Sequence, residues 1–170
     1  MIWKRSLLVA LLAITGLALE TTLFGSLTLT GTKPELLLLI TVALAIGEGP
    51  ALGATAGFAL GLATDLVLEL PQGLSALTFT LAGYAVGRVR MHVQTPTAWL
   101  PMALVSVTTF AAVLFYGGIS FLLGEPISVF RSLRHAGLAA GYNALLTPFV
   151  FPLVRGLAAR LRPRMTEVIR

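Results

Sequence analysis

Two acidic side chains lie within long apolar stretches of this 170-residue chain, and they are the first candidates for chemistry. Asp65 follows Gly53, Gly57 and Gly61 at a constant four-residue step, whereas Glu20 lies in the earlier run LALETTLF. A four-residue step keeps side chains near one face of a helix, so this pattern predicts a glycine groove with a carboxylate at its end. In lipid such a groove allows another helix to approach closely, and a carboxylate beside it must face protein, water or a partner.

Each carboxylate has two interpretations. Asp65, expected near the outer end of its helix, could bind a partner or substrate; alternatively it reaches interfacial water or pairs with Arg131 or Arg134 in a loop on the same side. Glu20 could be turned inward and hydrogen-bonded or protonated, because exposing it at the bilayer centre costs about 2.5–3.5 kcal/mol or more. Alternatively it lies near the outer interface beside two threonines.

Three other residues are expected to hold helices together. Gly83 and Gly87 repeat the four-residue spacing that is typical of packed membrane helices. Asn143, the only asparagine, lies in the apolar run AAGYNALLTP. Buried amides in membranes bond across helices, so we expect Asn143 to join helices rather than to recognise a ligand.

Composition identifies an integral membrane protein. Hydrophobic residues make up 56% of the chain, charged residues only 11%, and the mean hydropathy is +0.91. A soluble domain carries roughly a quarter charged residues. The chain has no cysteine, which excludes disulfides and thiolate metal sites, and its net charge of +5 does not indicate nucleic acid binding in a membrane protein.

The apolar runs predict an all-α, polytopic membrane helix bundle in one domain, residues 1–170. About six transmembrane helices are expected, at 6–27, 34–46, 50–68, 73–89, 99–123 and 136–157, followed by a basic C-terminal tail at 158–170. The first run is interpreted as a membrane helix rather than a signal peptide, since it continues past Glu20 without a small-residue cleavage site.

The second segment is short for a membrane span. Its length corresponds to about 20 Å of helix, against a hydrocarbon core of about 30 Å. It either begins earlier, across 28–33, or is a half-span or re-entrant piece. Pro34 is predicted at the first helical position with Thr32 as its cap, and the helix dipole favours Glu35 in the first turn.

The basic residues predict the orientation. If the N-terminus is inside, nine Lys and Arg residues fall on the cytoplasmic side and three on the outer side, so both termini are expected in the cytoplasm. The tail at 158–170 could lie on anionic membrane lipid, dock a cytoplasmic protein, or serve only as an anchor.

No motif indicates catalysis. The sequence contains no HExxH, GxSxG or P-loop pattern. His92 and His135 are expected at loop edges on opposite sides of the membrane, where they cannot share a site. We therefore predict a non-enzyme without catalytic, cofactor-binding or metal-binding residues.

Five short motifs together resemble the family of the bacterial rod shape-determining protein MreD. They are PELLLL at 34–39, GPALG at 49–53, GFxxGLxxD at 57–65, GLSAL at 73–77 and LAGYxxG at 81–87. The remainder agrees in length, number of spans and the basic tail. The resemblance implies a fold similar to the six-helix substrate-binding subunits of energy-coupling-factor transporters, and it brings no catalytic residues with it.

The resemblance further implies a scaffold of the cell-elongation machinery in the bacterial inner membrane. Such a protein binds the bitopic protein MreC and works with the MreB filament, the glycosyltransferase RodA and a penicillin-binding transpeptidase. The alternative is a small-molecule-binding subunit of an energy-coupling-factor type transporter, which the scarcity of polar residues in the spans disfavours. An enzyme acting on lipid-linked precursors is the third possibility.

Overall fold

All the regular secondary structure in the described part of the chain is α-helical. The computed structural model describes residues 2–26, 32–67, 73–92, 99–124 and 128–160. Its helices are α1 (Ile2–Ser26), α2 (Leu36–Glu48), α3 (Pro50–Val67), α4 (Leu74–His92), α5 (Leu100–Leu122) and α6 (Val129–Arg160). All six expected apolar segments form helices within these ranges, as a polytopic membrane bundle requires.

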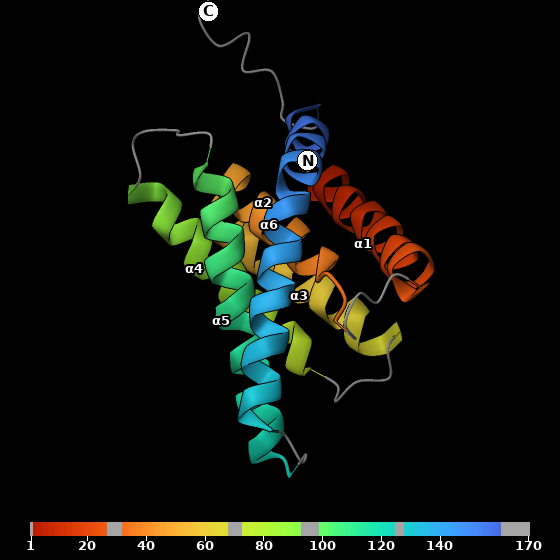
Figure 1. The fold of residues 1–170 in the computed structure, drawn as a ribbon. Coiled ribbons are helices and arrows are strands. Elements are labelled where there is room, and N and C mark those ends of the chain that lie inside the picture. Colours follow the sequence, from red (N-terminus) through yellow and green to blue (C-terminus); the bar gives the residue numbers. More distant parts are fainter. Residues whose placement is uncertain (1, 27–31, 68–72, 93–98, 125–127, 161–170) are drawn as a thin grey trace, which may run out of the picture.

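Helix α2 lies at the centre of the bundle. It contacts each of the other five helices, and every residue from Leu36 to Ala45 is buried. Because its sequence, LLLLITVALAIGE, is apolar on all sides, it can be surrounded by protein without leaving a polar face unpaired. Figure 1 shows α5 and α6 side by side in front of it, with α1 and α4 at opposite edges of the view.

Helices α3 and α4 form the most extensive contact between described helices. The glycines of α3 face α4 of the same chain: a methyl group at Gly53 would lie 2.6 Å from the carbonyl oxygen of Gly83, and one at Gly61 would lie 2.5 Å from that of Ser75. At Gly57 it would collide with the Phe79 carbonyl. The two backbones approach each other as closely as small-residue packing in membranes allows.

Gly87 completes the α3–α4 contact on the opposite end from Gly61. A methyl group there would meet the backbone of Pro50, where α3 begins. The preceding Gly49 has a φ of 93°, a left-handed value that favours glycine, and its N–H donates to the carbonyl of Ala45 at 3.0 Å. This turn reverses the chain from α2 directly into α3.

The helices support a multi-pass membrane protein. Among the described residues, three helices are long and apolar enough to cross a membrane: Pro50–Val67, Leu100–Leu122 and Val129–Ala159. Two shorter apolar helices, Val9–Thr22 and Leu36–Glu48, accompany them. Large apolar side chains on α5 and α6, such as Val107 and Phe149, are exposed, as lipid-facing residues are.

The expected start of the second helix is wrong. Helix α2 begins at Leu36 with Glu35 as its N-cap, so Pro34 is not the first helical residue, Thr32 is not the cap, and the helix does not start earlier across 32–33. The remainder of that earlier alternative, 28–31, lies outside the described residues. The peptide groups of Glu35 are bound by a side chain of α6, which fixes the helix start after them.

Helix α6 begins at Val129 rather than at Ala136 and continues to Arg160, into the expected tail. Arg131, Arg134 and His135 therefore lie on a helix and not in a loop or at its edge, and His92 is the last residue of α4. The remainder of the tail, 161–170, lies outside the described residues. The sequence places this start too late because the first turns of α6 carry charged residues, as loops commonly do.

The close glycine contact predicts that an added methyl group destabilises the protein at the α3–α4 contact but not at an uncrowded glycine. Gly57→Ala should destabilise the protein by about 1–3 kcal/mol, because its methyl group must displace the backbone of Phe79. The matched control is Gly141→Ala on α6, which meets nothing within 4 Å and should be neutral or slightly stabilising. Thermal unfolding in mild detergent measures both. Equal midpoints for the two variants would contradict the packing shown here.

Candidate functional site

Asp65 caps the N-terminus of α4 from the neighbouring helix. One carboxylate oxygen accepts hydrogen bonds from the N–H groups of Gly73 at 2.9 Å and Ala76 at 3.1 Å, and the other accepts from Ser75 at 3.1 Å. The first N–H groups of a helix have no partner within it, and the helix dipole favours a negative charge there. Asp65 is only 1% exposed, so it supplies these acceptors where water cannot.

This arrangement differs from both structural alternatives expected for Asp65. The side chain is buried away from interfacial water, and it accepts hydrogen bonds from backbone N–H groups of α4 rather than pairing with Arg131 or Arg134. The reason is that α3 and α4 are antiparallel neighbours, so the end of one lies beside the start of the other. A contact between Asp65 and a partner protein stays a prediction, and its hydrogen bonds serve the α3–α4 pair.

Asn143 joins three helical segments inside the bundle. Its Oδ1 accepts a hydrogen bond from the Glu35 N–H at 3.1 Å, and its Nδ2 donates to the Glu35 carbonyl at 3.1 Å and to the Thr109 hydroxyl at 3.0 Å. The side-chain amide thus pairs with the peptide groups just before α2 and also with α5. A completely buried amide with three partners is fully consistent with interhelical bonding.

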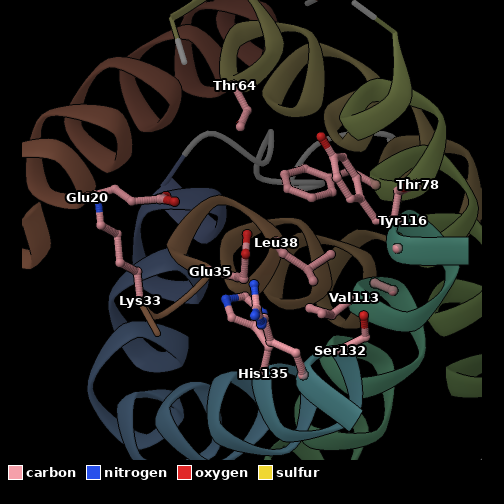
Figure 2. Close-up of a pocket in the computed structure, with 14 residues that line it drawn as sticks. Glu20, Lys33, Glu35, Leu38, Thr64, Thr78, Val113, Tyr116, Ser132 and His135 are labelled. Carbon is pink, nitrogen blue, oxygen red and sulfur yellow. The ribbon is translucent and has the colours of Figure 1, made fainter. Parts of the chain in front are cut away.

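A cavity, called the first cavity, lies between the end of α1, the start of α2, the last turns of α3 and α5 and the first turns of α4 and α6. Its volume is about 450 Å³. Figure 2 shows Glu20 and Glu35 extending into the same space from different segments, with Thr64 and Thr78 on other walls. Leu38, Phe79 and Val113 supply apolar surface. This is the size and lining of a site for a small molecule.

Charged side chains of both signs line this cavity. Glu20 is 8% exposed, and its Oε2 has no hydrogen-bond partner. Glu35 is partly buried, whereas Lys33 and Arg131 are exposed. Glu20 is therefore turned inward, into the cavity and away from lipid. The Thr21 and Thr22 hydroxyls bond to carbonyls of their own helix, and the placement of Glu20 near the outer interface stays a prediction.

Sequence reasoning missed most of this cavity. The sequence places Arg131 and His135 in a loop or at its edge, with Arg131 as a possible partner of Asp65. It places Glu35 in a first helical turn and assigns no role to Lys33. The sequence indicates these residues only by placing ionisable side chains beside apolar runs, and ordinary helix ends have the same pattern. In the part of the chain that the structure describes, no group of three or more His, Cys, Asp or Glu residues could hold a metal ion.

Both carboxylate oxygens of Asp65 accept hydrogen bonds, so the stability of the protein should depend on each of them. Asp65→Asn should destabilise the protein by about 1–3 kcal/mol, because an amide NH₂ replaces an acceptor facing buried N–H groups. Asp65→Leu should cost more, since all three donors lose their partner. Thermal unfolding in detergent gives the order. A wild-type midpoint for Asp65→Asn would show that neither charge nor second oxygen matters.

Asn143 should matter more than the hydroxyl it binds. Asn143→Leu leaves the buried N–H and one bond of the carbonyl of Glu35 unsatisfied and should cost about 1–3 kcal/mol for each group. Thr109→Val removes only one of the three bonds and should cost about 0.6 kcal/mol, no more than about 1.7. The same unfolding assay ranks them, and a larger loss for Thr109→Val would refute this assignment.

Comparison with known proteins places the chain in a family. Residues 3–157 match the family model described as rod shape-determining protein MreD. No curated protein and no solved structure matches the chain significantly. The matched range includes the α3–α4 glycine contact, the Asp65 cap, Asn143 and the whole cavity lining. Because the match covers nearly the whole chain, this multi-pass membrane protein belongs to the MreD family, whose members act in determining rod shape.

Proposed function

We propose that this chain is a non-enzymatic scaffold of the cell-elongation machinery. The observation that carries the proposal is the family match over residues 3–157. The family is a shape-determining structural family, and the sequence holds no catalytic motif. In this role the protein binds MreC and helps to couple peptidoglycan synthesis to the MreB filament. MreB, RodA and a penicillin-binding transpeptidase are the further partners, bound directly or indirectly.

The packing constrains where a single-span partner binds. Gly53, Gly57 and Gly61 face α4, so the small-residue groove is filled within the chain. A partner helix must therefore use the outer, apolar surface of the bundle. The glycines and Asp65 support such binding indirectly, because they hold α3 and α4 in a fixed relation.

We place the protein in the bacterial inner membrane with both termini in the cytoplasm. A second cavity groups the end of α2, the end of α4, the start of α5 and the end of α6, with Arg90 and Arg155 in its lining. Lys33 and Arg131 line the first cavity, at the other end of the bundle. The side of the bundle that holds the second cavity carries the larger number of basic residues, which supports placing that side in the cytoplasm. A likeness to energy-coupling-factor substrate-binding subunits belongs to the same proposal.

Affinity purification from native membranes tests the proposal. The tagged full chain, expressed at its native level and extracted in mild detergent, should retain MreC and cell-wall synthases, identified by mass spectrometry. An unrelated tagged multi-pass protein at equal expression is the control. Depletion of the chain should convert rods to spheres.

The transporter alternative predicts a different set of partners. Recovery of paired ATPases with a stoichiometric vitamin-like ligand, and no MreC, would overturn the scaffold. Retention of rod shape after complete depletion would do so independently of any purification.

A further inference from the structure

One oxygen of the Glu20 carboxylate, Oε2, is an unpaired acceptor in the lining of a cavity. The residue is 8% exposed. Leaving a buried polar group unsatisfied costs about 1–3 kcal/mol, and more for a charged group. An ionisable residue inside a membrane bundle is therefore expected to have a functional partner. The partner must approach through the cavity, which is the open space that the side chain faces in Figure 2.

The buried polar groups of this cavity all offer acceptors. Besides Glu20 they are Thr64 and Thr78. The Thr64 hydroxyl donates to the Leu60 carbonyl at 3.0 Å, and the Thr78 hydroxyl donates to the Leu74 carbonyl at 2.8 Å. Each hydroxyl proton is thereby used, and the oxygen lone pairs remain for a ligand. A complementary ligand must bring several N–H or O–H donors and preferably a positive charge.

The other charged residues of the lining are compatible with a positively charged ligand. Glu35 adds a second carboxylate to the lining, and the cations Lys33 and Arg131 are exposed. An ammonium group is complementary to the two carboxylates because it carries a positive charge and three N–H donors. Leu38, Phe79 and Val113 form the apolar wall against which methylene groups can pack.

We propose that this cavity binds the primary ammonium group of a small amphiphile, with Glu20 and Glu35 receiving the ammonium and the apolar wall receiving the chain. Two sources share this chemistry: the headgroup of an aminophospholipid and a free alkylamine. The exposed Lys33 and Arg131 suit the phosphate of the former. The site goes beyond scaffolding, since it does not depend on any protein partner.

Hexylammonium is the probe for the free amine. The full chain is placed in nanodiscs of phosphatidylglycerol alone, and thermal unfolding and calorimetric titration are measured with hexylammonium or with hexanol, which lacks the charge. Hexylammonium should bind saturably and raise the unfolding midpoint, and hexanol should not. Glu20→Gln should weaken binding about ten- to hundredfold. Glu48→Gln, at the other end of α2, should bind as wild type.

Native mass spectrometry tests the lipid source. Protein released from nanodiscs of mixed phosphatidylethanolamine and phosphatidylglycerol should retain phosphatidylethanolamine, and Glu20→Gln should lose it. Retention of the lipid without a hexylammonium response assigns the site to the headgroup, and the reverse assigns it to a free amine. Both results support the ammonium site.

Three outcomes would overturn the proposal. The first is an equal response to hexylammonium and hexanol, with no selective lipid retention. The second is a lower unfolding midpoint of ligand-free Glu20→Gln, which would give Glu20 a structural partner instead of a ligand. The third is binding that appears only in Lys33→Gln, which would show that Lys33 itself supplies the ammonium group in the wild-type protein.

Discussion

The short helix α2 begins inside the bundle, and the rest of the structure depends on how the backbone at its start is held. Backbone polar groups in a membrane interior must find partners within the protein. Here Asn143 binds both peptide groups of Glu35, the residue before α2, and its remaining N–H binds Thr109, so one side chain links the start of α2 to α5 and α6. Held in this way, a thirteen-residue helix can lie at the centre of longer ones. The first cavity forms in the space beyond the start of α2.

The α3–α4 pair solves the same problem differently. Its glycines bring two backbones into contact along their length, which places the end of α3 beside the start of α4. Asp65 is then in position to accept from three N–H groups of the facing helix. The two features reinforce each other, because the cap requires the close approach and also holds it. A groove that first indicates an external partner is thus an internal contact, as small-residue packing in lipid equally permits.

These contacts hold the centre of the bundle together. Membership of the MreD family assigns the protein a role in determining rod shape. The cavity is a separate feature, because the Oε2 of Glu20 has no hydrogen-bond partner whereas the buried side chains of Asp65 and Asn143 have theirs. Proteins tolerate such a group where a ligand completes it.

The sequence alone determined the membrane class, the six helical segments, the glycine faces and the presence of acids in apolar runs, because hydrophobic periodicity and composition are local properties. It also indicated the family through five short motifs. It could not give the start of α2, because a residue 108 positions away binds Glu35. Nor could it join Glu20 to Glu35, or Asp65 to the α4 N-terminus. Those contacts depend on which helices are neighbours and on how far one helix is shifted along another, and only tertiary packing determines these two features.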